Sequence, residues 1–273
     1  MLDTFIYFYK MNSKIGFILL CLCLYCSGFA QKSELKLEST IELVANEFVG
    51  IDKFDNVYYI KNNTLFKTTP ANEKIAYQDI LLGDILRVDI LNPNKISVFY
   101  SLSNVVIILD NRLTEIDRQD FNYSRPFKNV SHAGTSKDQS LWIYNIDLNQ
   151  LELFDYRYDK TIAKSVPISD EIFKIENNFN YCFLKVPDGI LIYNIYGSFI
   201  KKVPISSPFS FNLFKNKLIA HHGDELMCYG TDFEITEIIK VDFEDYKSLF
   251  YKDENLYLYN GNILKKYKIS PKN

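Results

Sequence analysis

The stretch YKDENLYLYNGNILKKYKI (Tyr251–Ile269) contains two short segments in which apolar and polar residues alternate, joined by Asn and Gly. A period of two is typical of a β-strand with one buried face, and Asn and Gly favour the tight turn of a hairpin. The stretch therefore predicts a β-hairpin. Whether this hairpin recurs decides what kind of β-protein the chain forms.

The same plan recurs along the chain. IDKFDNVYYIKNNTLFKTT (Ile51–Thr69) and SKDQSLWIYNIDLNQLELFDYR (Ser136–Arg157) are close copies, each with an Asp-containing turn before an apolar and aromatic strand. Weaker copies occupy Lys95–Asp117, Tyr181–Lys202 and Lys217–Ile238. The six hairpins begin near residues 56, 95, 140, 181, 217 and 255. An interval of roughly 40 residues is typical of repeat architectures such as β-propellers.

Further strand-like runs complete each repeat. One run precedes each hairpin, as in ILRVDIL (Ile85–Leu91), EIFKIE (Glu171–Glu176) and FSFNLF (Phe209–Phe214), and another follows it. Four strands per repeat form a propeller blade, whereas a sandwich or jelly roll does not repeat one hairpin plan at this interval. The sequence predicts an all-β fold, a six-bladed β-propeller. Seven blades are the alternative if the segment before the first hairpin holds a degenerate blade.

The last repeat supplies only three strands, Lys247–Lys252, Asn255–Tyr259 and Ile263–Ile269. At the other end, SELKLESTIELV (Ser33–Val44) alternates like a strand and belongs to no nearby hairpin. We expect it to be the outer strand of the last blade, which would close the ring. Closure would also cover an open sheet edge, a common site of aggregation.

The segment MNSKIGFILLCLCLYCSGFAQK begins at Met11 and reads as an export signal. Lys14 provides the basic flank, Ile15–Tyr25 an apolar run too short to cross a bilayer comfortably, and small residues permit cleavage before Gln31. We predict a signal peptide over residues 1–30, with Met11 as the start, and a single propeller domain over residues 31–273. The mature protein is then periplasmic or peripheral to the outer membrane.

Cysteines leave two questions open. Cys21, Cys23 and Cys26 lie in the leader, so lipidation, most plausibly at Cys26, is an alternative, although large residues precede all three. Cys182 and Cys228 lie in apolar strand-like runs, where an unpaired thiol behaves as a small hydrophobic group. Two buried thiols are favoured over a disulfide between them, which an oxidising compartment would permit.

The sequence offers little reactive chemistry. His221 and His222 are adjacent on a strand and point to opposite faces, and His132 is the only other histidine. No nucleophile elbow or glycine-rich phosphate loop occurs among the 10 glycines. The formal net charge of −3 gives no reason to expect nucleic acid as a partner. We therefore predict no catalytic residues, no cofactor site and no metal site.

Paired carboxylates and aromatic residues have both structural and functional interpretations. The carboxylate pairs are Asp52 with Asp55, Glu244 with Asp245, and Asp253 with Glu254. Pairs of this kind can bind calcium or act as acid and base, but Asp in a tight turn commonly caps its own backbone, which we favour. We also expect aromatic strand residues to pack between blades instead of binding sugar or peptide: Tyr58, Tyr59, Trp142, Tyr144, Tyr193, Tyr257 and Tyr259.

Three turn-and-strand segments carry a family resemblance. DKFDNVYY (Asp52–Tyr59), DQSLWIY (Asp138–Tyr144) and DENLYLY (Asp253–Tyr259) resemble the Asp-x-x-Gly-Asn-(Leu/Ile)-(Trp/Tyr) signature of NHL-type and sensor-type propeller repeats. The glycine of that signature is absent from all three copies. The resemblance supports the architecture and says little about partners.

Longer stretches resemble a group of short exported propellers of Bacteroidota, namely Val88–Asp117, Leu141–Asp155 and Gly189–Ile205. Within that group the chain is also similar to the periplasmic plug subunit of the type 9 secretion translocon. The resemblance implies a protein partner, an outer-membrane complex, and no catalytic role. It rests on hydrophobic patterning more than on reactive residues.

The function expected from the sequence is an exported, non-catalytic propeller that binds protein or assists assembly, as a plug or accessory subunit of a secretion channel. The alternative is a propeller lyase or hydrolase acting on a carbohydrate or lactone, which requires carboxylates or histidines converging at the mouth of the central channel. A sensor domain is a third interpretation. It is disfavoured because no apolar membrane segment follows the last repeat.

Overall fold

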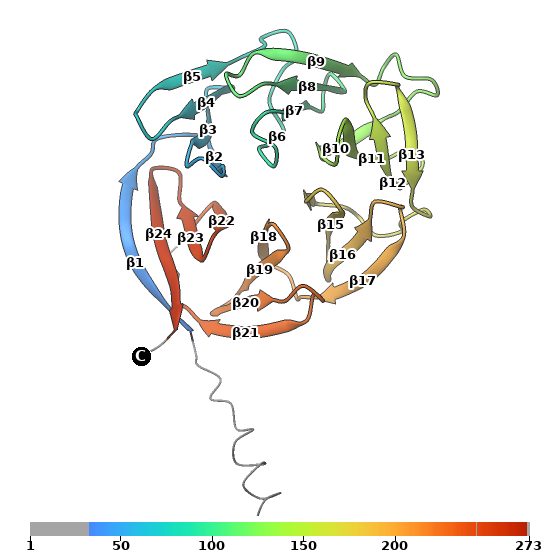
Figure 1. Ribbon diagram of the computed structural model, residues 1–273. Helices are drawn as coiled ribbons and strands as arrows, with labels where there is room; N and C mark the ends of the chain where they lie inside the picture. Colours follow the sequence, from blue (N-terminus) through green and yellow to red (C-terminus); the bar gives the residue numbers. More distant parts are fainter. Residues whose placement is uncertain (1–32, 244, 272–273) are drawn as a thin grey trace, which may run out of the picture. The chain divides into compact units, whose positions relative to one another are not determined.

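All the hairpins expected from the repeat are present, and they belong to six antiparallel sheets of four strands arranged around a common centre (Figure 1). The structure is a computed structural model that describes residues 33–243 and 245–271. Residues 34–270 form one compact unit. The predicted signal peptide lies outside the described residues and stays a prediction.

Each sheet is one blade, numbered here in chain order with the innermost strand first. Blades 1 to 3 comprise β2 (Glu47–Ile51), β3 (Val57–Lys61), β4 (Thr64–Thr68) and β5 (Lys74–Tyr77); β6 (Arg87–Asp89), β7 (Ile96–Tyr100), β8 (Val105–Leu109) and β9 (Glu115–Asp120); and β10 (Val130–Thr135), β11 (Ser140–Asn145), β12 (Gln150–Asp155) and β13 (Lys160–Lys164). Blades 4 to 6 comprise β14 (Lys174–Asn177), β15 (Tyr181–Val186), β16 (Gly189–Asn194) and β17 (Phe199–Pro204); β18 (Ser210–Phe214), β19 (Lys217–His222), β20 (Glu225–Tyr229) and β21 (Ile235–Lys240); and β22 (Ser248–Lys252), β23 (Asn255–Tyr259), β24 (Ile263–Pro271) and β1 (Ser33–Glu42).

The predicted six-bladed propeller is confirmed. Strand β1 pairs with β24, so the N-terminal strand completes blade 6 as expected (Figure 1). The segment before the first hairpin contributes β1 to blade 6 and β2 to blade 1. No residues remain in the described part of that segment for a seventh blade.

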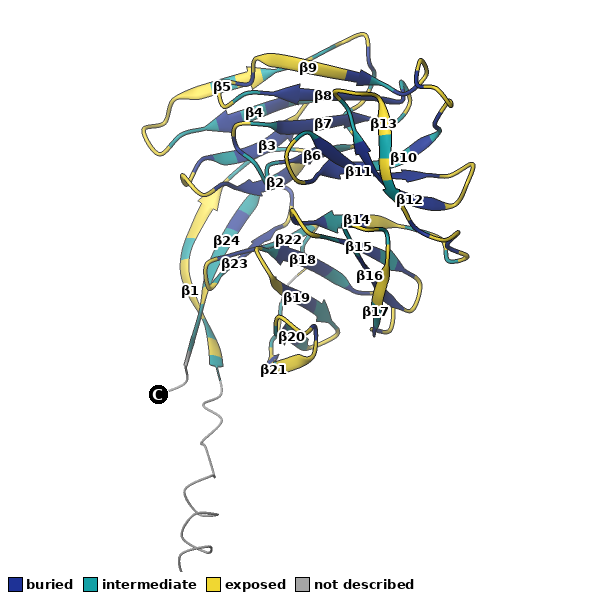
Figure 2. Cartoon of the chain, turned by 45° about the vertical axis from the view of Figure 1, so that its right-hand side comes forward, coloured by how far each residue is buried: buried dark blue, intermediate teal, exposed yellow. Residues whose placement is uncertain are grey.

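The hydrophobic core consists of six separate clusters, each lying between two neighbouring blades. The cause is the alternation of the strands, because successive side chains point to opposite faces of a sheet and each face meets a different blade. Burial is greatest in the second and third strands of the blades and lowest in the outermost strands, which are largely exposed in Figure 2. The loops and the outermost strands therefore carry most of the exposed surface.

The aromatic residues singled out in the sequence are all buried, which confirms the prediction that they pack inside the ring. Trp142 is fully buried, and its indole Nε1 donates to the Asn178 carbonyl oxygen in blade 4 at 3.3 Å. Both Cys182 and Cys228 are free thiols. Cys182 is buried as predicted, whereas Cys228 is only partly buried; burial raises the pKa of its thiol to about 11.

Tyr259 links the two ends of the ring. Its hydroxyl group shares one proton between the carbonyl oxygens of Ala45 at 2.8 Å and Gly261 at 2.7 Å, and accepts from the Ala45 amide at 3.0 Å. Ala45 lies in the loop between β1 and β2, so one buried side chain of blade 6 fixes the passage of the chain into blade 1.

We predict that Tyr259→Phe lowers the free energy of unfolding by about 1–2 kcal/mol, because it removes these hydrogen bonds and leaves the Ala45 amide without an acceptor. Urea unfolding followed by fluorescence measures the loss. Tyr257→Phe is the matched control, since this neighbouring hydroxyl on β23 forms no hydrogen bond within the described chain. Equal effects of the two substitutions would contradict the role given to Tyr259.

Candidate functional site

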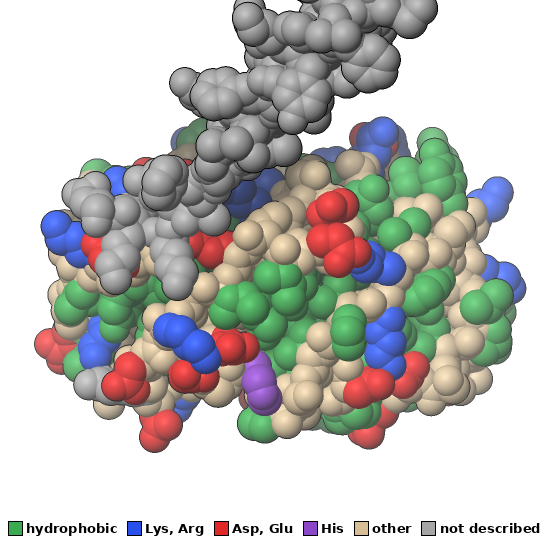
Figure 3. Space-filling model, turned by 90° about the horizontal axis from the view of Figure 1, so that it is seen from below, with side chains coloured by type: hydrophobic (Ala, Val, Ile, Leu, Met, Phe, Trp, Pro, Cys, Tyr) green, Lys and Arg blue, Asp and Glu red, His purple; other side chains and the backbone are tan. Residues whose placement is uncertain are grey.

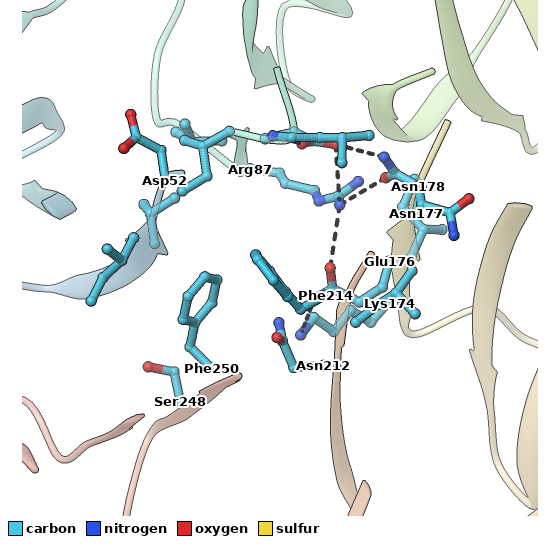
Figure 4. Close-up of a pocket in the computed structure, with 18 of the residues that line it drawn as sticks. Asp52, Arg87, Lys174, Glu176, Asn177, Asn178, Asn212, Phe214, Ser248 and Phe250 are labelled. Carbon is cyan, nitrogen blue, oxygen red and sulfur yellow. Dashed lines mark hydrogen bonds and ion pairs between the residues drawn. The ribbon is translucent and has the colours of Figure 1, made fainter. Parts of the chain in front are cut away.

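The innermost strands of the six blades surround a central cavity of about 540 Å³. Its wall contains both apolar and polar side chains, which come from the inner strands and the loops next to them. Polar groups come mainly from blades 1 to 4, and Phe214 and Phe250 come from blades 5 and 6. Figure 4 shows both phenyl rings projecting into the cavity.

A charged cluster joins three blades on the polar side of this cavity. The guanidinium of Arg87 donates to the Asn177 side-chain oxygen and to the Ala133 carbonyl oxygen, both at 2.9 Å. Arg87 also lies 3.6 Å from the carboxylates of Asp89 and Glu176. The cluster therefore connects β6 of blade 2, β10 of blade 3 and β14 of blade 4 at the wall of the channel (Figure 4).

Asn177 completes the connection. Its amide nitrogen donates to the Asp89 carboxylate at 2.8 Å and to the Thr135 carbonyl oxygen at 2.6 Å. Asp89 also accepts from the Thr135 amide at 2.9 Å. Both amide hydrogens and the oxygen of Asn177 thus have partners, so this residue serves the architecture of the ring and has no free donor for a ligand.

Two glycines make room for the groups that line the channel. A Cβ at Gly134 would lie 2.2 Å from the Asn177 side-chain oxygen and 2.3 Å from an Arg87 nitrogen. A Cβ at Gly50 would lie 2.5 Å from the ring of Phe250, and the Gly50 φ of 151° is itself unfavourable for other residues. Gly50 therefore allows Phe250 to rest against β2 from the neighbouring blade.

Glu47 and His132 are the channel groups with the most unusual electrostatics. Glu47 opens to solvent in the channel but is surrounded by protein, and the resulting desolvation raises its pKa in spite of Lys174 and Arg87. Desolvation, assisted by Arg87, lowers the pKa of His132, so its ring is neutral at pH 7. The His132 Nδ1 lies 2.9 Å from the Ser131 hydroxyl oxygen.

The two flat faces of the ring differ in the residues they expose. One face, here called the arc face, consists of the turns between the second and third strands of each blade and the loops between blades. Of the large apolar residues that are exposed in loops, eleven lie on the arc face: Val44, Ile80, Leu81, Leu86, Leu102, Tyr123, Phe127, Ile146, Leu148, Val166 and Phe173. The opposite face has four: Phe54, Tyr158, Phe179 and Tyr196.

Ten of these eleven lie in five consecutive loops over blades 1 to 4, here called the apolar arc: residues 78–86, 101–104, 121–129, 146–149 and 165–173. Exposure is extreme at Leu81 (88%) and Leu102 (86%). The rim also exposes apolar residues, but these lie on the outermost strands. On the side of the rim that Figure 3 shows, hydrophobic side chains form a central patch bordered by acidic and basic ones.

Hydrogen bonds join the loops of the apolar arc in series. The Ser103 hydroxyl donates to the Leu82 carbonyl oxygen at 2.7 Å, which links the first loop to the second. The next three links are Asn104 Nδ2 to the Lys128 carbonyl oxygen at 2.7 Å, Asn129 Nδ2 to the Asp147 carboxylate at 2.9 Å, and the Ile168 amide to the Asn149 carbonyl oxygen at 2.7 Å. The exposed apolar side chains are thus carried on one continuous, preorganised surface.

A buried ion pair anchors the middle of the apolar arc. Lys128 Nζ lies 2.7 Å from the Glu152 carboxylate, and both side chains are almost completely buried. Desolvation opposes the ionised form of Glu152, but hydrogen bonds from Lys128, Thr161 and Asn145 outweigh it and hold its pKa below the usual value. The pair fixes the 121–129 loop to β12 of blade 3.

The acidic turns have mixed outcomes. Asp52 caps its own turn as predicted, because its carboxylate accepts from the backbone amides of Phe54 at 2.8 Å and Asn56 at 3.0 Å. The same interpretation is wrong for Asp253, whose carboxylate instead binds Lys215 of blade 5 at 2.9 Å. The prediction fails there because the lysine of the neighbouring blade reaches the turn.

The other sequence candidates are Asp55, the pair Glu244 and Asp245, and the adjacent histidines His221 and His222. Asp55 pairs with Lys252 across the junction of blades 6 and 1. Glu244 lies outside the described residues, so the pair it would form with Asp245 stays a prediction. His221 contacts Tyr246 and His222 contacts the Pro208 carbonyl oxygen, as expected for opposite faces of a strand. Among residues 33–243 and 245–271 no group of acidic, His and Cys side chains could hold a metal ion.

The sequence interpretation missed the channel cluster and the apolar arc. A signal for the first was the appearance of charged residues in otherwise apolar inner strands, as at Arg87 and Asp89, or Lys174 and Glu176. A signal for the second was the apolar run Ile80–Leu82, which lies between strands. Neither signal alone says which side chains meet in space.

Comparisons with known proteins agree on the fold. No known protein family matches the sequence, and no curated protein matches it. A chain of the mitotic checkpoint complex is similar in structure, with a TM-score of 0.58 and 10% identity over 89% of this chain and 94% of that one. The Pan2 WD40 domain of Neurospora crassa gives 0.56 and 8% over 84% and 76%.

Virginiamycin B lyase from Staphylococcus aureus is also similar, with a TM-score of 0.57 and 12% identity over 88% of this chain and 90% of the lyase. At such low identity these likenesses show the propeller fold alone. They include both an enzyme and domains of protein assemblies, so the fold does not decide between the two functions. Within the described residues, no helix is long and apolar enough to cross a membrane.

We predict that Asn177→Ala destabilises the protein by about 2–3 kcal/mol, because it removes one buried hydrogen-bond partner from each of Asp89, Arg87 and the Thr135 carbonyl oxygen. Asn180→Ala is the control, since Asn180 is exposed at the channel wall. Denaturant unfolding of both variants measures the difference. A value for Asn177→Ala near that of the control would show that the cluster does not hold blades 2 to 4 together.

We predict a pH signature for the buried ion pair. Because the pKa of Glu152 is lowered in the folded protein, its contribution is complete above the unfolded value of about 4.3 and is lost as the pH falls through the folded pKa. Glu152→Gln should cost about 3 kcal/mol at neutral pH, since it leaves Lys128 buried without a counterion.

The stability difference between wild type and Glu152→Gln should therefore shrink as the pH is lowered from 6 toward 3, each point being measured by urea unfolding. Asp188→Asn is the control, because the Asp188–Lys202 pair is exposed and should contribute little. A difference that stays constant with pH would contradict the assigned ionisation of Glu152.

Proposed function

We propose that the protein is exported and acts as a non-catalytic protein-binding component, periplasmic or peripheral to the outer membrane. The observation that carries this proposal is the concentration of exposed large apolar side chains on one face of the ring, eleven against four on the other. Contiguous exposed apolar surface typically marks a protein interaction site. The apolar arc is the docking surface we assign.

The construction of the apolar arc supports binding. Its loops are tied to one another and to the blades by hydrogen bonds, so little conformational freedom has to be lost when a partner binds. Loops on a rigid scaffold are a common location of binding sites. Similar propeller chains in solved structures include one from the mitotic checkpoint complex.

The cellular setting rests on the predicted signal peptide. Export would place the ring in the periplasm, where the resemblance to short propellers of Bacteroidota suggests a role as a plug or accessory subunit of a secretion channel, such as the type 9 translocon. The apolar arc would then contact a large outer-membrane partner. This assignment joins a sequence prediction to the surface described above.

A propeller lyase or hydrolase acting on a carbohydrate or lactone is the second candidate, because Glu47, His132 and Glu176 line one cavity. Virginiamycin B lyase has a similar fold, and its histidine-to-alanine variant is inactive. Here Glu176 is paired with Lys174 at 2.6 Å, and His132 contacts Ser131. Turnover of quinupristin that depends on His132 would replace the binding proposal; intact quinupristin after incubation would remove this lactone as a substrate.

We predict that the C-terminally tagged protein, isolated gently from the envelope of its native host, carries a protein partner in near-equal amount. Leu81→Glu combined with Leu102→Glu should reduce the recovered partner at least tenfold, since each charge would have to be buried at an apolar interface. Quantitative mass spectrometry measures the ratio of partner to tagged protein.

The matched control is Tyr158→Glu combined with Tyr196→Glu, on the opposite face. All four side chains are more than 70% exposed, so neither pair of substitutions should affect folding. Recovery of a lone protein would reject the binding function. Equal loss in both pairs, or in neither, would reject the arc face as the docking surface.

A further inference from the structure

The apolar arc carries charges of mostly one sign. Its five loops contain the acidic residues Asp79, Asp84, Asp147, Asp170 and Glu171 and the basic residues Arg125 and Lys128. Lys128 is buried against Glu152, and Asp79 is paired with Arg118 of β9. Four carboxylates and one guanidinium therefore have no partner of opposite charge within the arc, although the Asp147 carboxylate also accepts from Asn129.

The four carboxylates lie in the first, fourth and fifth loops of the arc. Asp84 follows the apolar run of the first loop, Asp147 lies between the exposed residues Ile146 and Leu148, and Asp170 and Glu171 occupy the last loop. Asp84, Asp147 and Glu171 are exposed and Asp170 is half-buried. The negative charges thus flank the second and third loops, which expose Leu102, Tyr123 and Phe127 and contain Arg125 but no carboxylate of their own. A complementary partner must combine apolar groups with positive charge on either side of them.

The arc continues into the channel mouth. Leu86 and Phe173, which are both about half exposed, lie at the inner ends of the first and last loops and also line the central cavity. Glu47 lines the same cavity from blade 1, and its carboxylate forms no hydrogen bond or ion pair with other described residues. An acceptor for a cationic group therefore lies beside the inner end of the apolar surface.

From this arrangement we infer that the apolar arc binds a polypeptide segment of the partner that combines apolar residues with Lys or Arg. The inference rests on the proposed protein-binding function and names the chemistry of the partner. Apolar side chains would pack on Leu81, Leu102 and Phe127, and basic side chains would meet the carboxylates of the first, fourth and fifth loops on either side. One basic side chain would reach Glu47 at the channel mouth.

The charge pattern predicts how binding depends on conditions. Exposed carboxylates speed the encounter with a basic segment, and salt screens this attraction over about 8–10 Å. The apolar contacts are insensitive to moderate salt. Affinity should therefore fall as salt is raised but should not vanish, in contrast to a purely electrostatic contact.

The probe is a fluorescent synthetic peptide in which Leu and Phe alternate with Lys. A second peptide has the same apolar residues and Glu in place of Lys. Fluorescence anisotropy with the full-length mature protein should show binding of the Lys peptide at least tenfold tighter than that of the Glu peptide. Asp84→Lys combined with Glu171→Lys should weaken the Lys peptide about tenfold, and Glu47→Gln should weaken it severalfold.

Glu73→Lys combined with Glu254→Lys is the matched control, because it makes the same change of net charge on exposed turns of the opposite face. This control should leave the affinity within twofold of wild type. Equal loss in both charge-reversed variants would show non-specific attraction to an acidic protein and would overturn the inference, as would equal binding of the two peptides.

The result is separable from the proposed function. If the envelope partner is still recovered and depends on Leu81 and Leu102, but the charge reversal at Asp84 and Glu171 does not affect its recovery, the protein binds a partner of other chemistry. In that case the basic segment is wrong and the binding function stands. If no partner is recovered at all, the proposed function itself fails.

Discussion

Closure of the ring is the constraint on which the rest of the structure depends. The blades pack side by side, so five junctions form between segments adjacent in sequence, and the sixth must join the two ends of the described chain. That junction has the smallest of the six core clusters, with Phe48, Ile51, Tyr257, Tyr259 and Leu264 as its buried members. Pairing of β1 with β24 and the three bonds of the Tyr259 hydroxyl supplement it.

The need to hold blades together also explains where the unusual side chains are used. The aromatic residues that could suggest sugar or peptide binding in the sequence are instead buried in the hydrophobic clusters between blades. The charged cluster around Arg87 also holds blades together, because Asn177 and Asp89 form hydrogen bonds with each other and with the backbone of β10. What is left for function lies in the loops and in the few channel groups without partners, such as Glu47.

The fold could be predicted from the sequence because a hairpin is a local signal. Alternation and turn residues identify each strand pair within about 20 residues, and their recurrence fixes the number of blades. The channel cluster could not be predicted, since Arg87 and Asn177 are 90 residues apart and meet only when blades 2, 3 and 4 are assembled around the channel. The apolar arc could not be predicted either, because Ile80, Leu81 and Leu102 are exposed only in the context of the assembled loops.

The asymmetry of the two faces follows from how each one fastens neighbouring blades. On the opposite face a lysine in one blade binds the acidic turn of the next, as in Lys252 with Asp55 and Lys215 with Asp253, so the turns there must stay polar. On the arc face, amide side chains fasten adjacent loops instead of lysines: Asn104 donates to the Lys128 carbonyl oxygen and Asn129 to the Asp147 carboxylate. Most other exposed positions of these loops make no contact within the described chain that holds the blades together. Those positions carry the apolar residues and most of the carboxylates that we propose bind the partner.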